Sequence, residues 1–320
     1  MCNRNIPGVK KIRKPDMSIE LFQKIARSTF PITRALYLSI GAEPLMAKAF
    51  PDMLDVVGRY RIPEVSFITN GTLLNRQIID RLIRGGVTSI LVSVDGADPE
   101  TFGSIRRGAK FQNVVDNLRL MQQIKEQQHS AIPGIRFSVT LMRKNIEQLP
   151  AIVRLAKDLG VESIHASHMV LYKGLNLQEE SLIHYKTLTN ECLDEARKQA
   201  ENFGITFFGP SNFNDPESLV PSSEGTGKKS SKECNFPWTE FFIFPDGKVR
   251  PCCFWYDASR MGDFNTQSFK KIWKGKEYKR LREELKTGRM RKTCLNCPLN
   301  KDSGSFDDQA FIEQETDPDS

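Results

Sequence analysis

Short apolar runs alternate with amphipathic helical patterns between residues 17 and 210, and this alternation restricts the fold more than any other feature of the sequence. Strands are predicted at 35–40, 65–69, 89–94, 136–141 and 163–166. The helices predicted between and beyond them cover 50–60, 75–83, 111–127, 146–159 and 182–202. Strands of Val, Ile and Leu that alternate with helices are typical of a parallel sheet. The sequence therefore predicts an α/β fold of repeated strand–helix units.

Glycine or polar residues follow each predicted strand. Gly41, Asn70-Gly71 and Asp95-Gly96 stand where strands end. In a barrel of strand–helix units, the carboxyl ends of the strands carry the chemistry. Asn145, His165 and His168 are expected near the same edge. Ser93 and Asp95 could each, taken singly, equally well cap a helix. Their joint order at successive strand ends is the stronger argument for a site.

The cysteines indicate a metal centre. The chain has seven, an odd number, and its first residues contain no apolar stretch typical of a signal peptide, so ligands are a better interpretation than disulfides. A hairpin turn at Gly247 would bring Cys234 and Cys252 together, and Cys294 and Cys297 form a CxxC pair. Four thiolates suit zinc or an iron–sulfur cluster, and the spacing alone does not decide between them.

Composition limits the partners. A chain of 320 residues allows one large domain and a small appendage, and no run of eighteen apolar residues suggests a membrane span. The net charge of +7 arises largely in 270–292, a pattern most often found on a solvated helix face. We expect a cytoplasmic protein that binds neither nucleic acid nor membrane. An acidic electron donor, such as flavodoxin or ferredoxin, would suit the basic segment.

The predicted organisation has four parts. A barrel domain covers 1–210, a linker rich in Ser, Gly and Lys covers 211–232, and a small cysteine domain covers 233–298. The tail, 299–320, is acidic and polar, and we expect it to be disordered.

The cysteine domain resembles a known family. Its pattern is Cys-x12-Gly-x4-Cys from Cys234 to Cys252, followed by a Gly-Asp-Phe-Asn segment at 262–265, Phe-Lys-Lys-Ile-Trp at 269–273 and the CxxC pair. This pattern resembles the SPASM domain, the auxiliary-cluster domain of radical S-adenosylmethionine (SAM) enzymes. The resemblance implies that Cys234, Cys252, Cys294 and Cys297 hold one auxiliary [4Fe–4S] cluster.

The first two thirds of the chain resemble the barrel of the same enzymes. Gly41-Ala42-Glu43-Pro44 is similar to the family's GGEP segment, with Ala in place of one Gly. The resemblance implies a partial (β/α)6 TIM-like barrel in which this segment binds the amino group of SAM. It further implies that polar groups at the next strand ends contact the ribose or carboxylate of SAM. Those residues are Asn70, Ser93, Asp95 and Arg106, although Arg107 is equally well placed in sequence.

The first cluster of such enzymes requires a CxxxCxxC motif, which this chain does not contain. Cys2, followed by Arg4, is similar to the third cysteine of that motif. We therefore expect the first strand and two further ligands to lie upstream of Met1. The second [4Fe–4S] cluster is expected only if those cysteines are present.

Two hypotheses follow. The first is a radical SAM/SPASM enzyme, or an N-terminally truncated form of one. It would reductively cleave SAM to a 5′-deoxyadenosyl radical and abstract hydrogen from a peptide or small-molecule substrate. The second is a non-catalytic protein whose four cysteines bind an iron–sulfur cluster or zinc.

Overall fold

The computed structural model describes residues 16–39, 41–169, 177–213, 234–253, 255, 260–295 and 297. These residues fall into two compact units. The first is formed mainly by 30–169 and 179–213, and the second combines the segment before residue 30 with the C-terminal region. Cys2, most of the predicted linker and the whole predicted tail lie outside the described residues.

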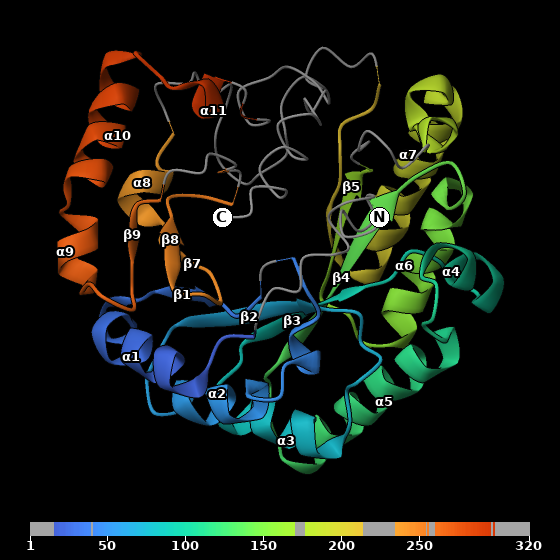
Figure 1. Ribbon diagram of the computed structural model, residues 1–320. Helices are drawn as coiled ribbons and strands as arrows, with labels where there is room; N and C mark the ends of the chain where they lie inside the picture. The colour runs from blue at the N-terminus through green and yellow to red at the C-terminus, as the bar shows by residue number, and fades with distance from the viewer. Residues whose placement is uncertain are drawn as a thin grey trace. The chain divides into compact units, whose positions relative to one another are not determined.

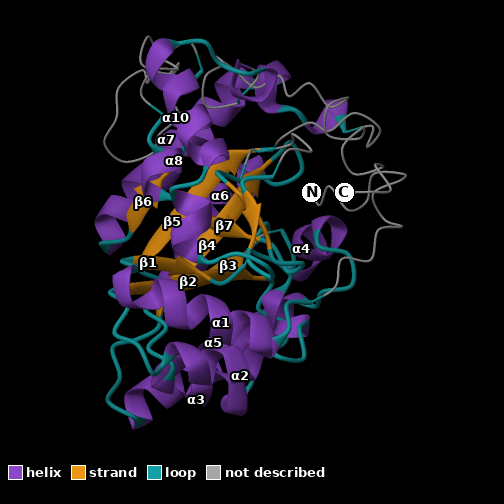
Figure 2. Cartoon of the chain, turned by 60° about the vertical axis from the view of Figure 1, so that its left-hand side comes forward, coloured by secondary structure: helices purple, strands orange, loops and turns teal. Residues whose placement is uncertain are grey.

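A parallel sheet forms the centre of the first unit (Figures 1 and 2). In the described residues it has six strands that follow one another in chain order. The strands are β1 (Ala35–Tyr37), β2 (Glu64–Thr69), β3 (Ser89–Ser93), β4 (Gly134–Leu141), β5 (Ser163–His168) and β6 (Thr206–Phe208). The predicted α/β fold and five of these strands are confirmed. The short strand β6 was not predicted, because its three residues carry no alternation long enough to be recognised.

Helices connect successive strands of this sheet. The α-helices are α2 (Phe50–Val57), α3 (Arg76–Arg84), α4 (Pro99–Ile105), α5 (Phe111–Gln127), α6 (Leu149–Asp158) and α7 (Lys186–Phe203). Short 3₁₀ segments are η3 (Phe30–Ile32), η4 (Pro44–Met46), η5 (Ile146–Gln148), η6 (Gln178–Glu180) and η7 (Leu182–His184). Figure 1 shows α2, α3, α5, α6 and α7 along one side of the sheet, which therefore has a helix-covered face and an inner face.

The two faces of the sheet differ in chemistry. On the helix-covered face, Phe67 of β2 contacts Phe50 of α2 with ring centroids 5.3 Å apart, and Ile90 and Ile135 are fully buried beside it in register. Because side chains alternate along a strand, Ser93, Ser138 and His165 lie in register on the inner face. The apolar face packed on helices forms the core, whereas the inner face carries several polar side chains.

The second unit is small and contains an antiparallel sheet. Its sheet, in the described residues, has the order β7 (Phe242–Ile243), β8 (Lys248–Arg250) and β9 (Gly262–Asp263). Its helices are α1 (Ile19–Thr29), α8 (Phe236–Thr239), α9 (Phe269–Trp273), α10 (Lys276–Thr287) and α11 (Lys292–Leu295). The predicted hairpin is confirmed, with Gly247 at φ +82° in the turn between β7 and β8. Phe241 anchors this unit, because its ring contacts those of Phe264, Phe269, Trp273 and Tyr278.

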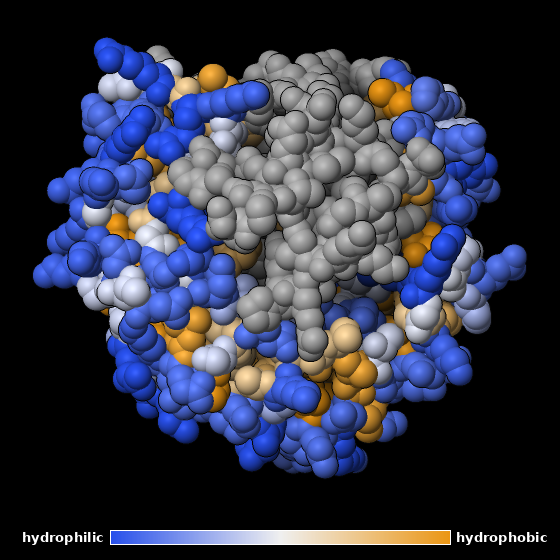
Figure 3. All heavy atoms as spheres, in the orientation of Figure 1, coloured by the Kyte–Doolittle hydropathy of each residue, from blue (hydrophilic) through white to orange (hydrophobic). Residues whose placement is uncertain are grey.

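The described surface is mostly hydrophilic in the view of Figure 3, with apolar side chains in small groups. Large apolar side chains that remain exposed, such as Ile32, Met46 and Ile183, are distributed over separate elements. No helix in the described part of the chain combines the length and the apolar character that crossing a membrane requires.

Gly71 follows β2 at φ +75°, and a Cβ atom there would lie 3.0 Å from Val92 Cγ1 and 3.1 Å from Val114 Cγ1. Gly86 has a similar φ of +68° but open space around its Cα. We expect Gly86→Ala to lower the free energy of unfolding by about 1–2 kcal/mol, the cost of the left-handed conformation. Gly71→Ala should cost a further 1–3 kcal/mol, roughly, through overpacking. Urea denaturation measures both, and equal losses would show that the close approach at Gly71 is unimportant.

Candidate functional site

Glu43 joins the ends of the first two strands. It lies at the N-cap of η4, where its carboxylate accepts a hydrogen bond from the Leu45 amide at 3.3 Å. The same carboxylate accepts hydrogen bonds from Thr69 Oγ1 at 2.8 Å and from the Asn70 amide at 2.6 Å, both at the end of β2. An ionised carboxylate has about four acceptor positions. Three are therefore occupied, and one remains for a cationic ligand.

Asn70 and Gly71 form the turn after β2. Asn70 Oδ1 accepts hydrogen bonds from the amide of Thr72 at 2.9 Å and from its hydroxyl at 2.6 Å. The Gly71 amide donates to Thr69 Oγ1 at 3.0 Å. The side-chain oxygen of Asn70 thus fixes the turn, and its backbone amide holds Glu43 in place.

Asp95 joins the ends of β3 and β4. Its side chain is only 1% exposed and accepts hydrogen bonds from the Thr140 amide at 2.8 Å and from Arg106 Nε at 2.6 Å. The alternative prediction, that Asp95 caps a helix, is wrong. Asp98 caps α4 instead, by accepting hydrogen bonds from the amides of Glu100 and Thr101. These amide donors hold the pKa of the Asp98 carboxyl below its ordinary value.

The structure also distinguishes two neighbouring arginines. Arg106, and not Arg107, forms the ion pair with Asp95. Only its Nε is engaged, so in the described part of the chain its two terminal nitrogens make no hydrogen bond. Ser93, two residues before Asp95, is largely buried on the same inner face of the sheet.

Three residues expected near the strand ends have different roles. Asn145 is fully buried and donates from Nδ2 to the carbonyl oxygens of Asp95 and Thr140, so it closes the loop after β4 instead of facing a ligand. His165 lies on the inner face, with Ser163 Oγ 3.2 Å from its Nε2. His168 lies three residues further along β5, and the alternation of the strand puts it on the helix-covered face. Burial lowers its pKa.

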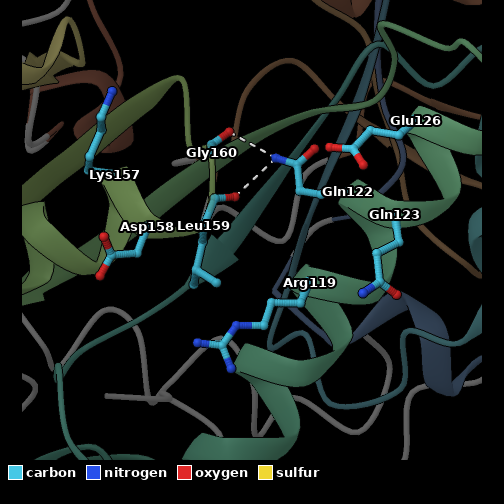
Figure 4. Close-up of a pocket in the computed structure, with 8 residues that line it drawn as sticks. All are labelled: Arg119, Gln122, Gln123, Glu126, Lys157, Asp158, Leu159 and Gly160. Atoms are coloured by element: carbon cyan, nitrogen blue, oxygen red, sulfur yellow. Dashed lines mark hydrogen bonds between the residues drawn. The ribbon is translucent and has the colours of Figure 1, made fainter.

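A surface pocket lies away from the strand ends (Figure 4). It is formed by the last turns of α5 and α6, which lead into the beginnings of β4 and β5. Gln122 Nε2 donates to the carbonyl oxygens of Leu159 and Gly160 across it, at 3.0 Å each. The other side chains that line it are charged or polar. None of the residues that line this pocket lies at the carboxyl end of a strand, where the chemistry of a strand–helix fold is found, so the pocket is not the candidate site.

The C-terminal cysteines lie in the second unit. Cys234 precedes α8, Cys252 follows β8, and the Cys297 amide donates to the carbonyl oxygen of Cys294 in a tight turn. Burial, and after it the nearby charges of Cys234 and Cys297, raise the pKa of the Cys294 thiol to about 12. Three of the four cysteines are thus electrostatically coupled. Among the described residues, however, no three His, Cys, Asp or Glu side chains form a closed metal site.

Unpaired donors accompany these cysteines. Tyr278 OH, Arg282 Nη2 and Arg291 Nη2 are buried without a hydrogen-bond partner. The charges of Arg291 and Cys294 interact, as do those of Tyr278 and Cys252. Orphaned donors next to thiols are unfavourable unless a negative group accepts from them. The residues present therefore fit a thiolate-bound iron–sulfur cluster, which carries negative charge.

Two family models match the chain. The model of the radical SAM superfamily matches residues 1–137, and SPASM, described as an iron-sulfur cluster-binding domain, matches residues 234–298. This chain belongs to the radical SAM superfamily and has a SPASM domain. The matches indicate SAM and [4Fe–4S] clusters as the cofactors of such a chain.

Radical SAM relatives agree with this assignment. The chain is 26% identical over 316 residues to the AdoMet-dependent heme synthase of Methanosarcina barkeri, covering 89% of this chain and 82% of that protein. It is 27% identical over 161 residues to the tungsten-containing aldehyde ferredoxin oxidoreductase cofactor-modifying protein of Pyrococcus furiosus. That match covers 48% of this chain and 44% of the relative, so the chain spans less than half the length of the second protein.

A solved structure shows the same fold. SuiB of Streptococcus suis, bound to S-adenosylmethionine, aligns with a TM-score of 0.63 at 14% identity, over 89% of this chain and 64% of SuiB. A second SuiB structure, bound to its precursor peptide SuiA, aligns with a TM-score of 0.65 at 13% identity, over 95% of this chain and 68% of SuiB. At this level of identity the likeness establishes the fold of the chain.

The structure brings the barrel candidates together in pairs. Glu43 contacts Asn70 across the carboxyl ends of β1 and β2, and Asp95, after β3, contacts Arg106 at the C-terminal end of α4. Gly41 has a φ of +69°, which allows the turn before Glu43, and Pro44 begins η4 directly after it. Ala42 lies between them and is exposed. Sequence reasoning missed Thr69 and Thr140, whose contributions depend on neighbouring strands and leave no local pattern.

We expect Asp95→Asn to lower the free energy of unfolding by about 2–3 kcal/mol, because it leaves Arg106 facing an amide donor in a mostly buried position. The matched control is Asp55→Asn, which removes an exposed partner of Arg81 and should cost less than about 1 kcal/mol. Urea denaturation of both variants measures the difference. A loss at Asp95 no larger than that at Asp55 would contradict a structural role for the buried pair.

Proposed function

We propose that this chain acts in a radical SAM/SPASM enzyme that cleaves SAM reductively and abstracts hydrogen from a peptide or small-molecule substrate. The observation that carries the proposal is the Glu43 carboxylate. It is fixed by groups from two strand ends and retains one acceptor position. A carboxylate held in this way can accept a charge-assisted hydrogen bond from the methionine ammonium of SAM.

The neighbouring strand ends supply the other contacts. The turn at Gly41-Ala42 leads the chain past the ammonium position to Glu43. Asn70 orients Glu43 through its amide, and Ser93 offers a hydroxyl for the ribose or carboxylate of SAM. Arg106 is held by Asp95 through Nε, so its terminal nitrogens can receive the SAM carboxylate. The protein's part is to bind and orient SAM, and a preorganised ion pair does this at small entropic cost.

The cysteines would hold the clusters. Cys234, Cys252, Cys294 and Cys297 would bind the auxiliary cluster, and Cys2 would be one ligand of the cluster that binds SAM. Bound iron–sulfur clusters supply the electron that cleaves the sulfonium of SAM and accept electrons afterwards. The unpaired donors of Tyr278, Arg282 and Arg291 would offset the negative charge of the auxiliary cluster.

The proposal also covers the class of substrate and the electron donor. One similar structure is SuiB bound to a precursor peptide, whereas one relative is a heme synthase. Both substrate classes therefore remain within the proposal. The helices α9 and α10 carry Lys270, Lys271, Lys276 and Lys279, and Lys274 lies between them. Such a basic surface would attract an acidic donor such as flavodoxin or ferredoxin by electrostatic steering.

The auxiliary cluster can be tested by metal content. After anaerobic reconstitution with iron and sulfide, we expect Cys294→Ser to bind about four fewer irons per chain than the wild type. Cys192→Ser is the matched control, because Cys192 lies on α7 in the other unit and should leave the iron content unchanged. Iron and sulfide analysis, with visible absorption, measures the loss. A colourless protein with stoichiometric zinc would instead favour the non-catalytic four-cysteine protein.

The SAM site can be tested at Glu43. We expect Glu43→Gln to weaken SAM binding by roughly 10- to 100-fold, since a hydrogen bond between charged groups contributes about 1.5–3 kcal/mol. SAM affinity is measured by isothermal titration, and 5′-deoxyadenosine formed with dithionite is measured by mass spectrometry. Arg61→Gln, at an exposed position away from the strand ends, should change neither quantity. Unchanged SAM affinity in a folded Glu43→Gln variant would refute the assigned role.

A further inference from the structure

We infer that the inner face of the sheet contains an anion-binding position, built on Arg136 of β4, that receives a carboxylate of the substrate. The inference rests on the proposed function, because it assumes that a substrate enters the inner side of this sheet. It goes further by naming the substrate class and the residue that selects it. Nothing in the SAM contacts described above requires Arg136.

The strand register places Arg136 on the inner face. Arg136 pairs with Leu91 of β3 on one side and with Ser163 of β5 on the other. Its neighbours along β4, Ile135 and Phe137, are completely buried, and Phe137 lies in register with Val92 on the helix-covered face. Because side chains alternate along a strand, Arg136 projects from the face opposite to Phe137.

Arg136 also lies well below the strand ends. It precedes Thr140 by four residues, and the Thr140 amide is the one that holds Asp95. At about 3.3 Å per residue, this separation is roughly 13 Å along the strand. The position is thus distinct from the strand-end groups assigned to SAM.

The guanidinium of Arg136 has no hydrogen bond or ion pair to any residue in the part of the chain that the structure describes. It is nevertheless half-buried. Removing a guanidinium from water without a partner is unfavourable, and Arg106 on the same side of the sheet has such a partner in Asp95. Ser89 precedes Leu91 by two residues on β3 and pairs with Gly134. Its hydroxyl, Ser89 Oγ, is buried without a hydrogen-bond partner. Two unsatisfied polar groups close together on neighbouring strands indicate a missing polar ligand.

The surroundings indicate the kind of anion. Leu91, which pairs with Arg136, also pairs with Ile68 of β2, whose side chain is 48% exposed. Two apolar side chains therefore lie beside Arg136 in the same register across the sheet. Glu64 and His165 are titratable residues of these strands on the inner face, and the carboxylate of Glu162 lies against Gly134 at the beginning of β4. None of the three adds a fixed positive charge. A single guanidinium matches the single charge of a carboxylate, which it binds with two parallel hydrogen bonds. The position therefore fits a carboxylate on an apolar arm better than a phosphate dianion.

Ligand-observed fluorine NMR can test this position, because it measures binding and does not depend on cleavage of SAM. The probe is 4-(trifluoromethyl)phenylacetate, with its neutral amide as the matched ligand and phenyl phosphate as a competitor. We expect the reconstituted wild-type protein to bind the acid and not the amide. Arg136→Gln should weaken binding of the acid by at least tenfold, roughly the loss of one charged hydrogen-bond pair. Arg136→Lys should retain part of it, and Arg61→Gln should bind like the wild type.

Several outcomes would overturn the inference. These are no binding of the acid by the wild type, equal binding of acid and amide, unchanged binding by Arg136→Gln, or preferential binding of phenyl phosphate. SAM affinity is measured on the same samples. Arg136→Gln should leave it unchanged, because Arg136 lies away from the strand ends. Failure of the carboxylate position with intact SAM binding would leave the proposed function standing, whereas loss of SAM binding in the wild type would refute the proposed function itself.

Discussion

Carboxylates that accept a hydrogen bond from a backbone amide of the neighbouring strand hold the carboxyl edge of the sheet together. Glu43, which follows β1, accepts a hydrogen bond from the amide of Asn70, which follows β2. Asp95, which follows β3, accepts one from the amide of Thr140 in β4. In a parallel sheet these amides lie where the regular ladder ends, so each needs another acceptor. A charged acceptor forms a shorter and stronger hydrogen bond than a neutral one. The same device therefore fixes two adjacent pairs of strand ends.

The groups that form these structural hydrogen bonds can form further hydrogen bonds. Glu43 retains an acceptor position, and Arg106 uses Nε on Asp95 while its terminal nitrogens stay available. A binding group that is already fixed loses little conformational entropy when its ligand arrives. The edge can thus be rigid and still offer one acceptor for a cation and one fork of donors for an anion. Those are the two charged ends of the methionine part of SAM.

The division of the sheet into two faces has a second consequence. Apolar side chains such as Phe67 and Phe137 pack against the helices, which leaves serines, His165 and Arg136 on the inner face. The guanidinium of Arg136, which has no partner in the described chain, becomes favourable there when a complementary anion binds. The strand ends would then bind SAM, while the deeper position at Arg136 would select a substrate that carries a carboxylate.

The sequence by itself determined the repeated strand–helix fold, the bounds of α5, the hairpin at Gly247 and the family, because each depends on local periodicity, a turn glycine or a motif. It placed Glu43, Asn70 and Asp95 at strand ends for the same reason. Only the tertiary structure decided that Arg106 and not Arg107 pairs with Asp95, that Asn145 closes a loop, and that Arg136 has no partner in the described chain. These facts depend on which residues of distant strands come into register, and register is set by packing across the whole sheet.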